Sequence, residues 1–290
     1  MIKAEDTITF IKSSDWSKVS NNWEAIGIVC IESRNTPDEK VRILSLDYMD
    51  YNNPTSGNSE TGVYMYWGDS GDISGVTNRD AVPCMSTSSD TQLTSSVQRS
   101  IDYARIPTDY FNEESSAVTG YKYTTITDGR YCPSMYLEDG TLNPDAIATV
   151  KTIPGTSTEF TINNANSDFN GAYNTQKIME LCRVDTPTNS YASGNYPAAQ
   201  CCSLYNKGGL SWYLPASGEL ACIVANFSKL NSSRTTVGFI GYNFNSCWFW
   251  SSTPYSSSNA RSVNGTNGYC SSNARSYSSS YARVLAVSAF

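Results

Sequence analysis

Histidine is absent from this chain of 290 residues. Histidine is the side chain that most often serves as a general base near neutral pH, and it is the commonest zinc ligand. Its absence excludes the Ser/His and Cys/His pairs on which many hydrolases depend. An enzyme that relies on other groups stays open, but most of the common types of active site are excluded.

The chain also lacks a long apolar run and an excess of positive charge. No segment approaches eighteen consecutive apolar residues, so we expect no membrane insertion. With 20 Lys and Arg against 27 Asp and Glu, the formal net charge of -7 argues against a nucleic-acid partner, which needs a basic face. The first residues include two acids and no apolar segment typical of a signal peptide, so none is predicted.

Nine cysteines are present, at positions 30, 84, 132, 182, 201, 202, 222, 247 and 270. Their number is odd, and no two of them have the C-x-x-C spacing of zinc and redox sites. We therefore expect reduced thiols, buried or on the surface, and not a disulfide framework.

The first part of the sequence has the pattern of β-strands. Two short apolar runs, 25–31 and 41–46, are separated by the turn-like residues 35–39, so we expect a hairpin. From about 51 to 167 the chain is rich in Ser, Thr, Gly, Asp and Tyr, with strand-like pieces such as 63–67. We interpret this stretch as a β-rich or loop-rich insertion.

Helical patterns occur only in the second part of the chain. Residues 174–181 and 197–205 are two short candidates, and Pro197 suits a first turn. The clearest helix follows Pro215, where Ser217 is placed to cap the first turn. Its apolar residues recur with helical spacing and predict one buried stripe, formed by Leu220, Ile223, Val224, Phe227 and Leu230.

The tract from 251 to 281 is unusually polar. It holds twelve serines, four asparagines and four tyrosines, and it contains no Lys, Asp, Glu, Gln or Met. This composition fits a disordered linker, but it also matches antibody paratopes, where Tyr supplies rigid contact area and Ser, Gly and Asn supply hydrogen bonds. Because Trp248 and Trp250 precede the tract and the apolar residues 284–290 follow it, we favour a supported binding surface.

Charge is restricted toward the carboxyl end as well. The last Asp is Asp185, the last Glu is Glu219 and the last Lys is Lys229, while arginines continue to Arg283. An ordinary solvated surface carries charges of both signs. This surface is therefore drawn from a restricted set of residue types.

Several motifs in this region resemble one protein family. They are the runs 208–220 (GGLSWYLPASGEL), 250–253 (WSST) and 259–264 (NARSVN), then Arg283 with Val284, and the terminal Ala289 with Phe290. In order and spacing they are similar to the variable proteins of diversity-generating retroelements, C-type-lectin-fold proteins that include the phage major tropism determinant. The resemblance covers residues 168–290, and residues 26–48 are similar to the opening strands of such proteins.

The resemblance implies a fold and a division of the chain. The expected class is α+β, a C-type lectin fold with an embellished β-rich amino-terminal region. Residues 1–167 would form that region and contribute the first strands, and residues 168–290 would form the lectin-type domain, with a variable region at about 242–285. The implied fixed frame consists of Trp250, Ser251, Ser252, Val263, Gly268, Val284, Ala289 and Phe290.

The family also implies an origin for the restricted set of residues. Template adenines are miscopied in such systems, so that Asn codons become Ser, Tyr, Cys, Phe, Thr, Gly, Ala, Arg or Asp codons, but never Lys, Glu, Gln, Met or Trp codons. The positions implied to vary and to bind ligand are Asn243, Asn245, Ser246, Cys247, Phe249, Tyr255, Ser256, Ser258, Asn259, Arg261, Ser262, Asn264, Thr266, Asn267, Tyr269, Cys270, Ser271, Ser272, Asn273, Arg275, Ser276, Ser278, Ser279 and Ser280.

The implied function is ligand binding, without catalysis and without a cofactor. The expected anchors are Tyr255, Tyr269, Phe249 and Arg261. If residues 248–250 form a strand, Phe249 should point to the opposite side from the two tryptophans beside it, which suits a ligand-facing residue. The expected partner is a cell-surface protein or glycan receptor. The expected setting is the tail tip of a phage virion, where several copies, as in a homo-oligomer, gain avidity. A bacterial surface adhesin whose export signal has been removed, and a lectin-like module of fixed specificity, stay open.

Two other functions on this fold fit the sequence less well. A calcium-dependent lectin needs Glu-Pro-Asn or Gln-Pro-Asp and Trp-Asn-Asp tripeptides as oxygen ligands, and neither kind occurs, so no metal is expected. A formylglycine-generating type of enzyme needs a reactive cysteine pair, and Cys247 and Cys270 have no evident basic neighbours in sequence. The run 68–72 (GDSGD) resembles a serine-protease nucleophile loop, but without histidine it is interpreted as a surface turn.

Overall fold

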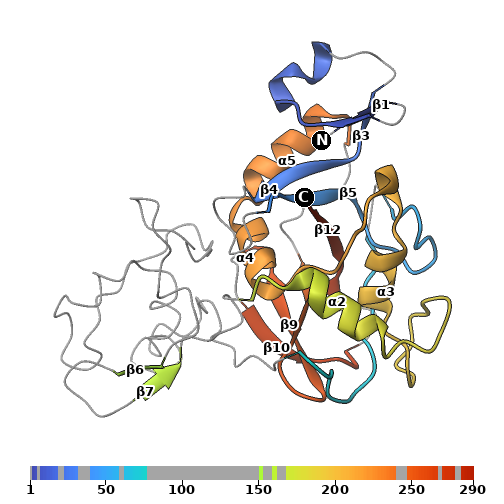
Figure 1. Ribbon diagram of the computed structural model, residues 1–290, viewed down its shortest axis with the longest axis vertical. Coiled ribbons are helices and arrows are strands. Elements are labelled where there is room, and N and C mark those ends of the chain that lie inside the picture. The colour runs from blue at the N-terminus through green and yellow to red at the C-terminus, as the bar shows by residue number, and fades with distance from the viewer. Residues whose placement is uncertain are drawn as a thin grey trace.

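The structure is a computed structural model that describes residues 2–4, 7–18, 23–31, 40–58, 62–76, 150–152, 159–161, 168–239, 247–266, 270–277 and 282–290. These residues form several sheets and helices, which confirms the expected α+β class (Figure 1). Within these ranges, none of the helices combines the length and the apolar character needed to cross a membrane.

The central sheet has the strand order β12-β5-β4 and joins the two ends of the chain. Strand β4 (Gly27–Ile31) pairs antiparallel with β5 (Arg42–Tyr48), which confirms the predicted hairpin. On its other edge β5 pairs antiparallel with β12 (Leu285–Ala289). Every residue of β5 is buried, so the amino-terminal part of the chain supplies the middle strand of a sheet that the carboxyl-terminal strand completes.

The polar carboxy-terminal tract folds into a second sheet, with the order β10-β9-β8-β11. Strands β8 (Trp248–Pro254), β9 (Asn259–Asn264) and β10 (Cys270–Ala274) are antiparallel neighbours, and β11 (Ala282–Arg283) pairs parallel with β8. All of β8 after Trp248 is buried. Backbone pairing and burial therefore order a segment whose composition alone fits a linker.

Two predicted helices are confirmed with shifted ends, α2 (Gly171–Met179) and α3 (Pro197–Leu204). The long helix predicted after residue 215 is instead two helices, α4 (Ser217–Ala225) and α5 (Phe227–Thr236). Asn226 separates them, because its side-chain amide donates to a backbone carbonyl one turn earlier (2.9 Å) and competes with the helical pattern.

The apolar stripe predicted for that helix is buried across both helices, from Leu220 to Leu230. The cap, however, differs from the prediction. Ala216 is the N-cap residue, and its N–H donates to the carboxylate of Glu219 (2.8 Å). Ser217 lies within the helix, and its hydroxyl donates to the hydroxyl of Thr253 (3.0 Å), because β8 packs against the start of α4.

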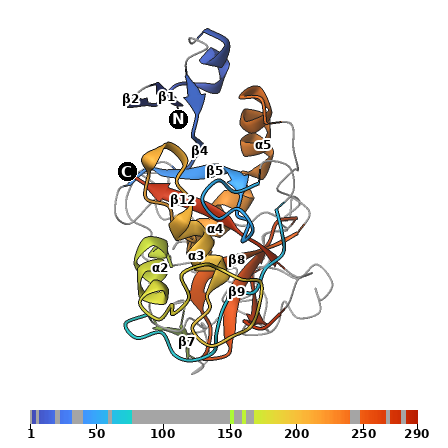
Figure 2. The ribbon, with the colours of Figure 1, turned by 90° about the vertical axis from the view of Figure 1, so that its right-hand side faces the viewer.

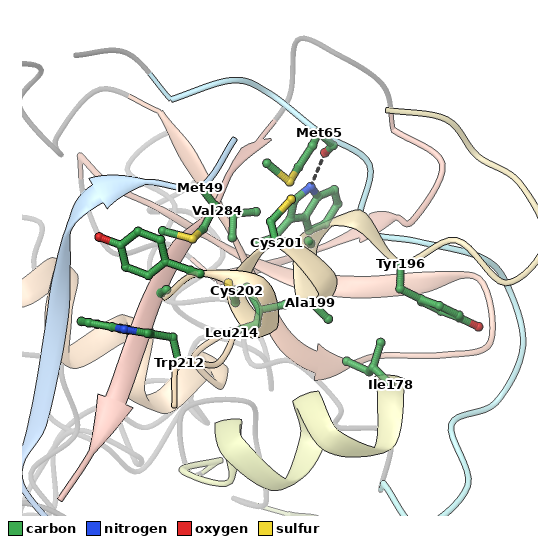
Figure 3. Close-up of a cluster of buried hydrophobic side chains, with 14 of the residues drawn as sticks. Met49, Met65, Ile178, Tyr196, Ala199, Cys201, Cys202, Trp212, Leu214 and Val284 are labelled. Carbon is green, nitrogen blue, oxygen red and sulfur yellow. Dashed lines mark hydrogen bonds between the residues drawn. The ribbon is translucent and has the colours of Figure 1, made fainter. Parts of the chain in front are cut away.

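An apolar cluster lies between α2, α3 and the two sheets, as the close-up in Figure 3 shows. Ile178 of α2 and Cys202 of α3 are fully buried in it. Trp250 belongs to the same cluster, and its indole N–H donates to the carbonyl of Met65 (2.8 Å). A second cluster, which includes Phe249, joins β8 to α4 and α5. The two faces of β8 are thus both covered.

Smaller elements complete the described chain. They are the sheet of β1 (Ile2–Ala4), β2 (Thr7–Thr9) and β3 (Glu24–Ala25), the pair β6 (Val150–Thr152) and β7 (Glu159–Thr161), and the short 3-10 helices η1 (Ser13–Lys18) and η7 (Lys207–Gly209). The strand-like run 63–67 forms no strand. Most of the predicted insertion lies outside the described residues.

The prediction of reduced cysteines is wrong at Cys222, which is disulfide-bonded. An odd count rules out complete pairing but not a single bridge. Cys30, Cys182, Cys201, Cys202 and Cys247 are free thiols, as expected. Burial raises the pKa of Cys201 and Cys202 well above the usual range, so both stay protonated and pack as small apolar side chains.

Candidate binding surface

The implied fixed frame is largely interior. Trp250, Ser251, Ser252, Val263 and Val284 are all fully buried. The two serines are held by hydrogen bonds: the hydroxyl of Ser251 donates to the carbonyl of residue 261 (3.0 Å), and the N–H of Ser252 donates to the carbonyl of residue 215 (2.8 Å). Ala289 is half-buried, Phe290 is exposed, and Gly268 lies outside the described residues.

A buried carboxylate fixes β8 to the two helices beside it. Asp168 accepts hydrogen bonds from the Thr253 hydroxyl (2.7 Å), the Asn174 amide (3.0 Å) and the backbone N–H of Asn170 (3.0 Å). The Thr253 oxygen in turn accepts from the N–H of Ser217 (2.9 Å). A buried charge is tolerated only when it is well hydrogen-bonded, and these donors meet that requirement. The strand that begins the polar tract therefore has a fixed position.

A second buried carboxylate lies under the central sheet. Glu219 accepts hydrogen bonds from the Arg42 guanidinium (2.7 Å), the Tyr213 hydroxyl (2.9 Å) and the backbone N–H of Ala216 (2.8 Å). Burial raises the pKa of Glu219 to about 7, while Arg42 and the other donors oppose that rise. This group joins β5 to the start of α4.

The accessible part of the polar tract lies on its turns and on β10. Tyr255 is 37% exposed, and Ser258, Thr266 and Ser276 are exposed too. The other predicted binding residues that reach solvent are half-buried: Ser256, Asn259, Asn264, Ser271, Ser272 and Asn273. Hydroxyl and amide groups dominate this surface, so it offers neutral donors and acceptors around a tyrosine ring.

Five predicted binding residues are instead buried: Cys247, Phe249, Arg261, Ser262 and Arg275. For Phe249 the expected orientation away from Trp250 is correct, but the exposure is wrong. Its ring stacks on Tyr48 (6.3 Å between centroids) and meets Phe227 edge-on (5.5 Å). The opposite face of β8 is covered by helices and by β5, so Phe249 belongs to the core.

Cys247 and Ser262 are enclosed by their neighbours. Arg283 donates to the sulfur of Cys247 (3.7 Å), and burial raises the pKa of that thiol to about 11. A protonated, buried thiol is a poor nucleophile, which gives no support to a reactive role for Cys247. Ser262 accepts a hydrogen bond from the amide of Asn273 across the β9-β10 pair (2.7 Å).

Arg261 is buried, and its guanidinium lies beneath the exposed Tyr255, 4.1 Å from the centre of the ring. Such a cation–π contact orients an aromatic ring. The structure therefore makes Arg261 a support for an exposed tyrosine, where direct contact with ligand was expected.

Arg275 lies at the junction of three segments. Its guanidinium donates to the carbonyls of Asp69 (3.2 Å), Gly71 (2.7 Å) and Ser256 (2.6 Å). It also lies 4.4 Å from the centre of the Trp67 ring. Burial lowers the pKa of Arg275 to about 10, and the group remains a cation at neutral pH. Arg275 was expected to vary on the surface, but it is buried and its hydrogen bonds connect the loop at residues 69–71 to the turn at Ser256.

A segment that the sequence did not assign to the site also reaches it, and a second segment is hydrogen-bonded to the first. The N–H of Gly71 donates to the carbonyl of Ser257 (2.7 Å), and the N–H of Asp69 donates to the carbonyl of Asn195 (3.0 Å). Residues 68–72 were expected to form a surface turn, but they form a loop in which Gly68 is buried and only Ser70 and Asp72 are exposed, and its contacts place it against the tract. The position of residues 68–72 against the tract depends on contacts between residues far apart in the sequence, so no local sequence signal could have predicted it.

Some predicted binding residues lie outside the described residues, namely Asn243, Asn245, Ser246, Asn267, Tyr269, Ser278, Ser279 and Ser280, as does the side chain of Cys270. Among the side chains that the structure does describe, no three His, Cys, Asp or Glu residues gather in a way that could hold a metal ion. Comparisons of this chain with family models, with curated proteins and with solved structures found no match.

Proposed function

We propose that the protein is a diversified binding protein with a C-type lectin fold, varied by retroelement-directed adenine mutagenesis. It recognises a cell-surface protein or glycan receptor as a phage receptor-binding protein, displayed in several copies at the tail tip. It carries out no chemistry on its ligand and uses no cofactor.

One observation carries this proposal. Within a single polar tract, Ser251, Ser252 and Val263 of the implied frame are buried and hydrogen-bonded, whereas Ser258 and Ser276 are exposed. Substitutions at exposed positions usually change the free energy of unfolding by less than about 0.5 kcal/mol. The exposed positions can therefore change residue type while the fold is kept, which is the property that diversification requires.

The support beneath the surface also suits binding. β8 is fixed by Asp168 and Thr253, and Tyr255 is held over Arg261. A surface ordered before it meets its ligand loses little conformational entropy on binding. Tyrosine on such a surface supplies a large contact area with only two rotatable side-chain bonds.

The test is sequencing of codons 240 to 290 in a growing population, with a search of the flanking DNA for a near-copy of this segment and for a reverse-transcriptase gene. We expect substitutions at the codons of exposed residues such as Ser258, Thr266 and Ser276, confined to adenine positions of the copy. The codons of Trp250 and Val263 should be constant, and codons 42 to 48 serve as an internal control. A uniform sequence without a nearby copy would contradict the proposal.

A further inference from the structure

Two segments outside the polar tract lie at the same end of the molecule as β9 and β10. In both Figure 1 and Figure 2 the segment 62–76, in cyan, and the segment 182–196, in yellow, run along the lower end of the view. The amino terminus lies toward the opposite end. Both segments precede the implied variable region, so diversification would leave them constant.

These constant segments are hydrogen-bonded to each other, and the segment 62–76 is also hydrogen-bonded to the tract. The carboxylate of Asp69 accepts from the N–H of Gly194 (2.9 Å), and the backbone N–H of Tyr66 donates to the side-chain oxygen of Asn189 (3.3 Å). Arg275 and the contact between Gly71 and Ser257 then join the segment 62–76 to the turns of the polar tract. The segment 182–196 is thus connected to these turns through the segment 62–76.

An aromatic pair lies on the constant part of this surface. The rings of Tyr66 and Tyr191 are 6.4 Å apart, and Tyr191 is 44% exposed. The turn beside Tyr191 is rigid, because the buried amide of Asn195 donates to the carbonyls of Thr188 (2.8 Å) and Ser190 (2.6 Å). A large side chain held on a rigid turn is a good candidate for a binding anchor.

We propose that Tyr66 and Tyr191 form a constant half of the binding surface, and that Arg275 is the positioning residue that holds this half against the variable turns. The inference rests on the proposed function. The partner that it fits is a folded protein, because rings and small polar groups spread over several turns make a broad contact. Continuity with the variable turns means that one partner would touch both halves.

The test uses the full chain in a display library in which Tyr255, Ser258, Ser271, Ser272 and Ser276 are randomised. The library is selected against lysozyme as a folded probe protein, and Tyr191→Ser is then introduced into several selected clones. We expect binding to lysozyme to weaken about tenfold or more in most clones. Phe10→Ser is the control, because Phe10 is 50% exposed beside the amino-terminal strands, and it should leave binding unchanged.

The outcomes separate the two proposals. If no clone binds lysozyme, the proposed function is contradicted and this inference with it. If clones bind and Tyr191→Ser leaves every affinity unchanged, the constant half is overturned while the proposed function stands. Tyr66→Ser provides a second variant of the same pair.

The role of Arg275 is tested by a double-mutant cycle in the same clones. Arg275→Lys keeps the charge but removes the planar fork that reaches three carbonyls, so the effect of Tyr191→Ser on affinity should shrink in this background. An undiminished effect of Tyr191→Ser would overturn the positioning role. Asp69→Ala removes the acceptor for the N–H of Gly194 and leaves Arg275 in place. The effect of Tyr191→Ser on affinity should shrink in this background too.

Discussion

At the scale of single residues, Glu219 shows how burial and hydrogen bonding compete. Three donors favour its ionised form, yet the loss of water raises its pKa from 4.5 to about 7. Between these two pH values the folded protein binds a proton that the unfolded chain does not bind. Protonated Glu219 therefore stabilises the folded protein. This contribution to the free energy of unfolding is fully present below about pH 4.5 and is lost as the pH rises through about 7.

This linkage predicts a pH-dependent difference between the parent and Glu219→Gln, which resembles the protonated form at every pH. The free energy of unfolding of the parent, relative to that of the variant, should fall by up to about 3 kcal/mol between about pH 4.5 and 8. Urea unfolding across this range measures it. Glu180→Gln, at the exposed end of α2, is the control, and a difference that is constant with pH would contradict the linkage.

Phe249 is the residue whose role changed most between sequence and structure. Its ring is fully buried against Tyr48 and Phe227, so Phe249→Ala should lower the free energy of unfolding by about 3 to 5 kcal/mol. Tyr191→Ala removes an exposed ring and should cost less than about 1 kcal/mol. Chemical denaturation of both variants checks this, and equal costs would mean that Phe249 is not a core residue.

At the scale of elements, β8 depends on the hydrogen bonds that tie it to α2 and α4. Thr253→Val keeps the shape of the side chain but removes the donor to Asp168 and the acceptor for both the N–H and the hydroxyl of Ser217. Three buried polar groups then lose a partner, so we expect a loss of about 2 to 4 kcal/mol in the free energy of unfolding. Thr235→Val on the exposed side of α5 is the matched control and should cost less than about 0.5 kcal/mol. A small loss for Thr253→Val would show that the network is dispensable.

Elements with strong local patterns were predictable from the sequence. The hairpin of β4 and β5, the helices α2 and α3, and the buried stripe from Leu220 to Leu230 follow from apolar periodicity and turn residues. The break at Asn226 depends on a side-chain hydrogen bond that competes with the helix, which periodicity does not encode.

The candidate surface was predictable only in part, for a different reason. Composition locates the polar tract, but burial within it depends on which partners cover each strand face. Phe249 lies under helices, and Arg275 meets the constant turn at Asp69 and Gly71, through contacts between residues about 200 positions apart. Such contacts are set by the tertiary fold, and no pattern along the tract reports them.

At the scale of the whole molecule, stability and recognition are carried by different residues of the same tract. Positions such as Ser251, Ser252 and Val263 face the interior of the fold, while Ser258 and Ser272 lie at its margin. Changes at separated exposed positions should add nearly independently, because these side chains share few partners. The fold should therefore tolerate many simultaneous changes at the exposed positions and few at the buried positions.

Two libraries of equal size test this division. Randomising the exposed positions Tyr255, Ser257, Ser258, Thr266 and Ser276 together should leave most members folded, with Tm values close to that of the parent, because a change at an exposed position usually costs less than about 0.5 kcal/mol. Randomising the buried set Ser251, Ser252, Thr253, Ala260 and Val263 should leave most members unfolded, because each change opens a cavity or strands a polar group. Protease resistance of the displayed proteins, measured clone by clone, compares the two. Equal losses would mean that the exposed positions carry stability too, and a surface of that kind cannot vary freely to follow new receptors.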